Sequence, residues 1–225
     1  MTVYMDTFHS VGARRRHAGK PTMVPMISSV LKPVVTRLIE PVARLALRVG
    51  LTPNTITLLG ALGVLISAGY FYPREEYFVG TLFICFFALS DLFDGTMARV
   101  SQKGASKWGG FLDSTIDRIT DSAITIAILI PLIESDDKLS YLGIITLVTG
   151  LLIPYIRAKA ESYSIACSVG IAERTERLVI ILTAIGFEGL NVPYALAIGL
   201  WLLAILGVIT VIQRVKVVHD GLLSQ

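Results

Sequence analysis

Long apolar stretches constrain this chain more than any other feature of its sequence. Of its 225 residues, 53% are hydrophobic and 16% are charged, and the mean hydropathy is +0.68. A helix needs about 20 mostly apolar residues to cross a bilayer, where the backbone must satisfy its own hydrogen bonds. Six stretches have this character, the fifth being the shortest: about 54–72, 77–99, 108–133, 139–160, 175–187 and 193–213. The sequence therefore predicts an all-α integral membrane protein with six transmembrane helices.

A different pattern precedes the first of these stretches. Between residues 28 and 50, apolar residues recur at helical spacing with basic residues between them. This is typical of an amphipathic helix in the membrane interface, where basic side chains favour anionic headgroups. Pro33 and Pro41 are expected to bend or divide it, and Thr52 is expected to cap the first span. We therefore divide the chain into a flexible cytoplasmic tail (1–27), a juxtamembrane amphipathic helix (28–50) and a membrane domain (51–219).

The basic residues predict how the spans are oriented. In the six-span arrangement only Arg74 and Lys138, among 20 Lys and Arg residues, lie on one side of the membrane. Because basic residues are retained on the cytoplasmic side, both termini and the loops 100–107 and 160–174 are expected in the cytoplasm. We predict a multi-pass protein of the plasma membrane whose polar site faces the cytoplasm.

Four carboxylates interrupt the apolar sequence where the second span ends and the third begins. Asp91 and Asp94 are three residues apart on one predicted helix, and Asp113 and Asp117 are four apart on the next, so each pair shares a helix face. An ionisable group at bilayer depth costs roughly 2.5–3.5 kcal/mol even on the mildest scale, so a cation is expected to balance these acids. Carboxylates without a nearby His or Cys favour Mg²⁺ or Mn²⁺. The two faces therefore predict a divalent-metal site.

Small and basic residues accompany the acids. Gly95 follows Asp94 directly and has no side chain, which allows a bulky ligand such as a nucleotide to approach the helix backbone. Gly109 could allow the same close approach on the facing helix. Ala98 keeps the face narrow, and Arg99 carries a guanidinium suited to phosphate oxygens. Basic residues are also ordinary at cytoplasmic helix ends, so the role of Arg99 depends on the motif around it.

The whole segment is similar to a known family signature. Residues 91–117 read DLFDGTMARVSQKGASKWGGFLDSTID, which resembles the CDP-alcohol phosphotransferase family, with all eight signature positions filled. The resemblance implies an enzyme in which an acceptor hydroxyl attacks the β-phosphorus of a CDP-linked lipid and displaces CMP, assisted by two Mg²⁺ or Mn²⁺ ions. It implies Asp91, Asp94 and Asp113 as metal ligands. Asp117 is implied at the metal and as the catalytic base for the acceptor hydroxyl.

The same resemblance implies a nucleotide site. Asn54 and Thr57 match a nucleotide-proximal position of the family, although the segment also fits an ordinary helix start. The residues expected to contact CDP are Asn54, Thr57, Asp91, Gly95, Ala98, Arg99 and Gly109.

The acceptor is predicted from a basic cytoplasmic segment between residues 154 and 181. Its cations could bind an anionic substrate, and positive-inside topology explains them equally well without one. The runs IRAKAE (156–161) and ERTER (173–177) resemble the bacterial phosphatidylinositol-phosphate synthases of this family, which implies CDP-diacylglycerol as donor and inositol 1-phosphate as acceptor. The loop 164–171 lacks the glycine-rich character expected there. Residues predicted to hold the acceptor phosphate are Arg157, Lys159, Arg174, Arg177 and, more weakly, Arg214.

Two alternatives remain open from sequence. A sibling enzyme, phosphatidylglycerophosphate synthase, would use glycerol 3-phosphate, whose phosphate the same cations could hold. A divalent-cation transporter would explain the acids, but not the glycines and Arg99 at their spacing. Gly60, Gly63 and Ser67 predict close helix packing, which together with the family resemblance suggests a homodimer in the lipid bilayer, and no nucleic-acid partner is expected.

Overall fold

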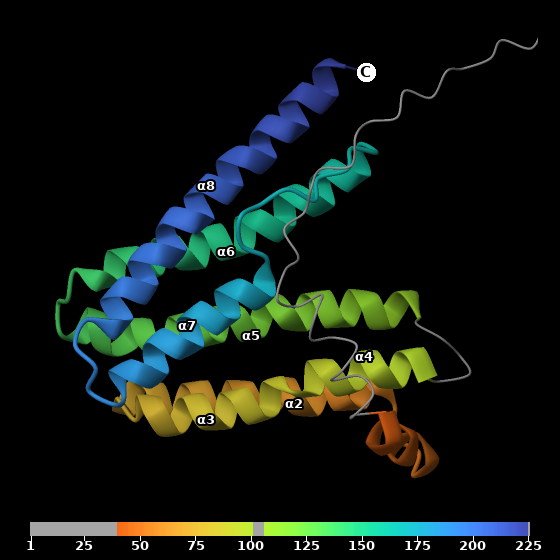
Figure 1. The fold of residues 1–225 in the computed structure, drawn as a ribbon, viewed down its shortest axis with the longest axis horizontal. Coiled ribbons are helices and arrows are strands. Elements are labelled where there is room, and N and C mark those ends of the chain that lie inside the picture. The colour runs from red at the N-terminus through yellow and green to blue at the C-terminus, as the bar shows by residue number, and fades with distance from the viewer. Residues whose placement is uncertain (1–39, 101–105, 225) are drawn as a thin grey trace, which may run out of the picture.

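The structure, a computed structural model, describes residues 40–100 and 106–224. Within these ranges the chain is helical and contains no strand (Figure 1). Residues 40–48 form a helical segment before the first labelled helix. The elements that follow are α2 (Pro53–Phe71), the 3₁₀ helix η1 (Tyr72–Arg74), α3 (Tyr77–Ala88), α4 (Ser90–Val100), α5 (Lys107–Glu134), α6 (Leu139–Ser162), α7 (Arg174–Glu188) and α8 (Ala195–Leu223).

The predicted all-α architecture is confirmed, and four helical segments are long and apolar enough to cross a membrane. These are Pro53–Arg74, Tyr77–Met97, Leu139–Ser162 and Ala195–Leu223. Helix α5 has 28 residues, but acidic and basic side chains occupy its first half. Helix α7 has 15 residues, or about 22 Å at 1.5 Å per residue, which is shorter than a bilayer core of about 30 Å. The number of six crossings therefore stays a prediction.

Much of the predicted N-terminal organisation lies outside the described residues. This applies to the tail 1–27 and to residues 28–39 of the predicted amphipathic helix. The described remainder is helical, and Arg44 donates to Glu40 across one turn at 2.6 Å. Thr52 caps α2 as predicted, since its hydroxyl accepts the Thr55 N–H at 3.2 Å.

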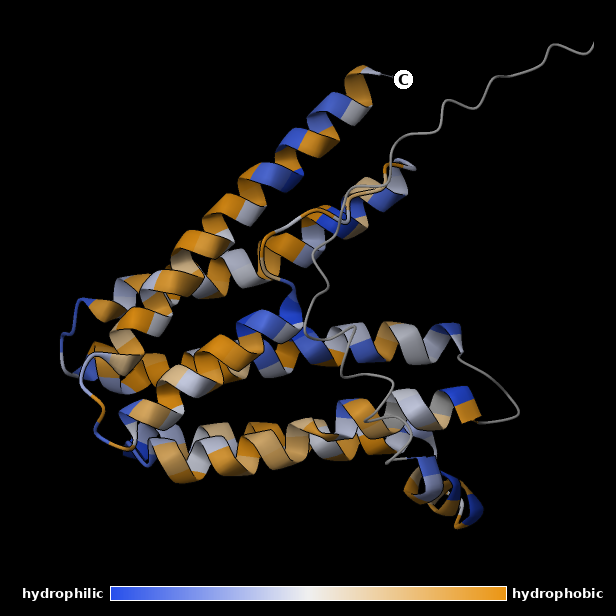
Figure 2. Ribbon diagram, in the orientation of Figure 1, coloured by the Kyte–Doolittle hydropathy of each residue, from blue (hydrophilic) through white to orange (hydrophobic). Residues whose placement is uncertain are grey.

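The helices pack as one bundle around an apolar core. Helix α2 contacts α3, α4 and α5, while α7 contacts α3 and α8, and α6 contacts α5 and α8. The core contains Val64, Ile84, Ile128, Ile185 and Leu200, all nearly inaccessible. Large apolar side chains also cover the outer faces of the bundle, as lipid contact requires, and α3 and the N-terminal half of α8 colour mostly apolar (Figure 2).

The small residues of α2 pack inside the chain itself. Gly60 and Gly63 are buried, and a Cβ on either would overlap the Ser90 hydroxyl or the Phe87 ring. The Ser67 hydroxyl donates to the Gly63 carbonyl at 2.7 Å in the interior. The prediction of close helix packing is confirmed, because the chain's own α3 and α4 occupy this stripe, and the homodimer stays a prediction.

The predicted second span, residues 77–99, is divided at Leu89 into α3 and α4. The division lies where Ser90 packs against the bare backbone of Gly60, so α4 begins in close contact with α2. Helix α4 therefore starts one residue before Asp91, and the first predicted metal ligand lies in its first turn.

Gly60→Ala tests this contact. The added methyl must displace Ser90, and overpacking of this kind costs about 1–3 kcal/mol, so the unfolding temperature in detergent should fall. Gly69→Ala on the same helix is the matched control, because a Cβ there meets no atom within 4 Å of it among the described residues. Equal unfolding temperatures for the two variants would contradict the close α2–α4 packing.

Candidate functional site

Carboxylates from two helices meet the side chain of Arg174, the first residue of α7. Its Nη1 lies 2.9 Å from Asp91 Oδ2 on α4 and 3.0 Å from Asp117 Oδ1 on α5. Its Nη2 and Nε lie 3.3 Å from Asp121 Oδ1, one turn further along α5. The polar start of α7 lies over a polar part of α5 between the apolar helices (Figure 2). One guanidinium thus connects three acids and three helices.

The local sequence explains how α5 presents its acids. The Ser106 hydroxyl caps the helix by accepting the Gly109 N–H at 2.9 Å. From there Asp113, Asp117 and Asp121 follow at intervals of four residues, which puts them on one face. Asp121 was missed in the sequence analysis, and the continued spacing of four was the signal that could have identified it.

The donor set fits a hard divalent cation. Oxygens of Asp91 and Asp117 both contact Nη1 of the Arg174 guanidinium, so these two predicted ligands already stabilise one positive charge between them. Asp113 lies exposed one turn before Asp117. Among the described side chains no group of three or more His, Cys, Asp and Glu is clustered as a metal site, and the side chain of Asp94 lies outside that description.

The predicted nucleotide residues lie on the facing ends of α2, α4 and α5. A Cβ on Gly95 would meet only Arg99 Nη1, at 3.9 Å, among the described atoms, so the space in front of this helix turn is open. Arg99 Nη2 donates to the Thr96 hydroxyl at 3.0 Å. A Cβ on Gly109 would lie 3.2 Å from Asn54 Oδ1, which means that Asn54 and the start of α5 are neighbours.

Two further predicted nucleotide residues are less open to a ligand or not described. Thr57 is buried, and its hydroxyl donates to the Pro53 carbonyl at 3.1 Å within α2. The side chain of Ala98 lies outside the part of the chain that the structure describes. The role of both residues toward CDP stays a prediction.

The cations predicted to hold the acceptor phosphate have different partners in the structure, and their role toward the acceptor stays a prediction. Arg157 is exposed and pairs with Glu161 at 3.0 Å, and Lys159 Nζ lies 4.9 Å from the centre of the Tyr163 ring. Arg174 forms ion pairs with Asp91, Asp117 and Asp121. Arg157 and Lys159 are exposed on the last turns of α6, whereas Arg174 is the first residue of α7.

Arg214 is buried, and its guanidinium donates hydrogen bonds to backbone carbonyls. Its Nε donates to the Val169 carbonyl at 2.9 Å and its Nη1 to the Ile153 carbonyl at 2.6 Å. Gly170, at φ +151°, packs against Thr210, where a Cβ would approach to 2.8 Å. The loop 164–171, whose conformation the sequence left open, therefore folds back onto α8.

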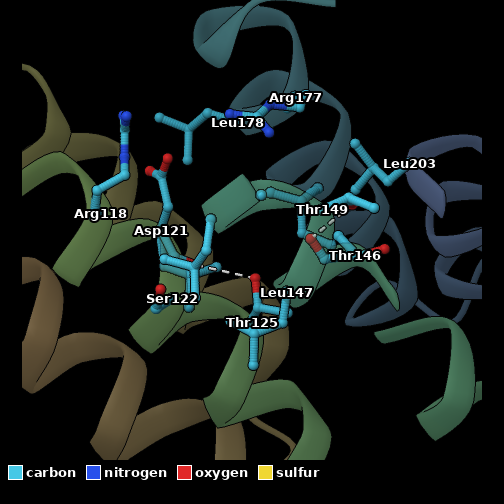
Figure 3. A pocket seen from close by; sticks show the side chains of 14 residues that line it. Arg118, Asp121, Ser122, Thr125, Thr146, Leu147, Thr149, Arg177, Leu178 and Leu203 are labelled. Atoms are coloured by element: carbon cyan, nitrogen blue, oxygen red, sulfur yellow. Dashed lines mark hydrogen bonds between the residues drawn. The ribbon is translucent and has the colours of Figure 1, made fainter. Parts of the chain in front are cut away.

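Arg177 reaches a pocket between α5, α6, α7 and α8 (Figure 3). Arg118 and Asp121 enter it from α5, and Thr146 belongs to the α6 wall. The Nε atoms of Arg118 and Arg177 and the hydroxyl of Thr146 are buried and have no hydrogen-bond partner among the described residues. Arg118 Nη2 also lies 3.5 Å from Asp117 Oδ2, so this pocket adjoins the acids.

Curated relatives cover most of the chain. It is 40% identical to the phosphatidylinositol phosphate synthase of Streptomyces avermitilis over 217 residues, which span 92% of this chain and 88% of that protein. It is 41% identical to the phosphatidylinositol phosphate synthase of Mycobacterium tuberculosis strain H37Rv over 187 residues, or 81% and 86% of the two chains. The similarity extends well beyond the acidic motif.

Solved structures agree with the fold. A crystal structure of Mycobacterium tuberculosis phosphatidylinositol phosphate synthase with CDP-DAG bound has a TM-score of 0.76 at 40% identity, covering 81% of this chain and 94% of that chain. The same protein in complex with manganese and citrate has a TM-score of 0.76 at 39% identity, covering 80% and 88%. The family model for CDP-alcohol phosphatidyltransferase matches residues 50–213. The chain therefore belongs to the CDP-alcohol phosphatidyltransferase family.

Proposed function

We propose that this protein transfers the phosphatidyl group of CDP-diacylglycerol to inositol 1-phosphate, releasing CMP and phosphatidylinositol phosphate. The observation that carries the proposal is about 40% identity, over most of both chains, to relatives named phosphatidylinositol phosphate synthase. The converging acids and the adjoining pocket lined by Arg118 and Arg177 support this proposal.

Asp91, Asp94, Asp113 and Asp117 would hold two divalent ions, Mg²⁺ or Mn²⁺. Bound there, the ions would neutralise the charge that builds on the pyrophosphate during transfer and stabilise the leaving CMP. Asp117 is the most enclosed described acid of this set, with 16% of its side chain exposed, compared with 35% for Asp91. We assign it the second task of accepting the proton of the attacking hydroxyl.

The CDP group would lie against the open turn of α4. Gly95 leaves the backbone accessible there, and the Arg99 guanidinium is close enough to contact a phosphate oxygen bound in front of it. Gly109 allows Asn54 to approach the start of α5 on the opposite side. Thr57 and Ala98 belong to the same proposed surface.

Inositol phosphate would occupy the pocket of Arg118 and Arg177. Buried polar atoms without partners are costly, so the two Nε groups and the Thr146 hydroxyl favour a ligand that offers both phosphate oxygens and hydroxyls. Arg118 adjoins Asp117, which puts the base at the edge of this pocket. Arg157, Lys159 and Arg214 would assist through the electrostatic attraction of the anion toward the same end of the bundle.

The membrane arrangement of this proposal has six crossings and a cytoplasmic site in the plasma membrane. The distribution of Lys and Arg supports this orientation. Residues 28–50 would lie in the interface as an amphipathic helix, with 1–27 as a tail and 51–219 as the membrane domain. We also propose that two copies of the chain form a homodimer.

Glycerol 3-phosphate is the competing acceptor, and cation transport is the competing activity. The named relatives do not favour either of them. Purified protein with CDP-diacylglycerol and Mg²⁺ should release CMP with inositol 1-phosphate, but not with free inositol or glycerol 3-phosphate. Turnover with glycerol 3-phosphate alone would move the protein to the sibling activity, and no CMP with any acceptor would refute the proposal.

Asp91→Asn tests the metal site directly. Removing a ligand should weaken Mn²⁺ binding on the order of 100-fold, since even residues outside the ligand shell contribute 10–100-fold. Electron paramagnetic resonance of free Mn²⁺ measures the affinity, and Asp220→Asn, an exposed acid of α8, is the control that should bind as the parent does. Unchanged Mn²⁺ affinity in Asp91→Asn would exclude this residue as a ligand.

Arg177→Gln tests the acceptor pocket. Losing one charge-assisted hydrogen bond of about 1.5–3 kcal/mol should raise KM for inositol 1-phosphate by roughly 10- to 100-fold, with little change in KM for CDP-diacylglycerol. Lys216→Gln, an exposed position on α8, serves as the control for loss of one positive charge. An equal change in both KM values would mean that Arg177 does not select the acceptor.

A further inference from the structure

The Arg174 guanidinium has two edges with different partners. Nη1 lies between Asp91 Oδ2 and Asp117 Oδ1, at 2.9 Å and 3.0 Å. The other edge, formed by Nε and Nη2, faces Asp121, with Nε at 3.3 Å from both carboxylate oxygens. The first edge therefore contacts predicted metal ligands, and the second contacts an acid outside the family signature.

A metal ion and the Nη1 edge would compete for one place. Mg²⁺ binds carboxylate oxygens at about 2.0–2.1 Å, so an ion held by the Asp91 and Asp117 oxygens that Nη1 contacts would take the place of Nη1. Two positive groups at that separation repel each other, and the oxygens cannot direct the same lone pairs to both. Metal binding at these two oxygens would therefore move this edge of Arg174 away.

We propose that Arg174 is a built-in counterion for the metal-free site, displaced from Asp91 and Asp117 when a divalent ion binds. Asp121 is the positioning residue, because it retains the opposite edge of the guanidinium and limits the movement to a short swing. The proposal rests on the metal site of the proposed function and adds a role for two residues of the chain.

The exchange keeps the acids compensated both before and after an ion binds. Three acids close together would repel one another in a partly buried setting, and Arg174 compensates them until the ion arrives. After the exchange, Nη1 has lost two acceptors while the side chain stays attached to Asp121. The freed N–H groups lie beside the ion, where they can donate to a phosphate oxygen of the substrate.

Mn²⁺ binding by the metal-free protein and three variants tests this exchange. Arg118→Gln is the matched control, because Arg118 also lies beside Asp117, at 3.5 Å, but not between the two ligands. Arg174→Gln should bind Mn²⁺ on the order of tenfold more tightly than Arg118→Gln, the equivalent of about one charged hydrogen bond no longer broken on binding. Arg174→Lys, which keeps the charge, should lie between Arg174→Gln and the parent.

Thermal unfolding gives a second measurement. Without metal, Arg174→Gln should unfold at a lower temperature than the parent, and saturating Mn²⁺ should raise its unfolding temperature by more than that of the parent. A destabilisation that is the same with and without Mn²⁺ would mean that Arg174 is only a structural link between helices.

The Mn²⁺-loaded parent protein tests the part assigned to Asp121. Its structure should have Nη1 away from Asp91 and Asp117 and Nε still on Asp121. Finding Nη1 on both acids with Mn²⁺ bound would overturn the inference, as would equal Mn²⁺ affinities of Arg174→Gln and Arg118→Gln, and in both cases the proposed function stands. Absence of Mn²⁺ binding by every protein tested would overturn the metal site itself, and with it both proposals.

Discussion

Charge compensation of the acids on α4 and α5 is the constraint on which the rest of this structure depends. The side chains of Asp91, Asp117 and Asp121 are partly buried in the bundle, where an unpaired carboxylate is expensive. Arg174 satisfies all three from the first turn of α7. This contact joins three helices at the end of the bundle that carries the site.

The position of Arg174 depends in turn on Arg214, which is buried. Arg214 on α8 donates to Val169, in the loop that leads into α7, and to Ile153 on α6. Gly170 makes this possible, because it has no Cβ to collide with Thr210. These contacts hold the loop against α8. Helix α7 then begins at Arg174, next to Asp91 and Asp117.

Sequence reasoning identified the helical architecture and the acids, and it was less successful with the cations. The spacing of Asp91 and Asp117 within their helices predicted the faces that converge, since a helix of known period fixes which residues share a face. Arg157 and Arg174, and more weakly Arg214, were predicted to hold the same acceptor phosphate. In the structure Arg157 forms an exposed ion pair within its own helix, Arg174 compensates acids, and Arg214 donates to backbone carbonyls. Long flexible side chains find partners by proximity in space, which spacing along the chain does not encode.

The sequence by itself determined the membrane helices, the acidic motif and the family, because hydropathy and residue spacing are properties of the chain alone. Only the tertiary structure decided the break at Leu89, the inclusion of Asp121 and the pocket formed by Arg118 and Arg177. Each of these depends on helices that are distant in sequence and adjacent in the bundle. Packing against Gly60 on α2 and the approach of α7 to α5 are contacts that no local pattern specifies.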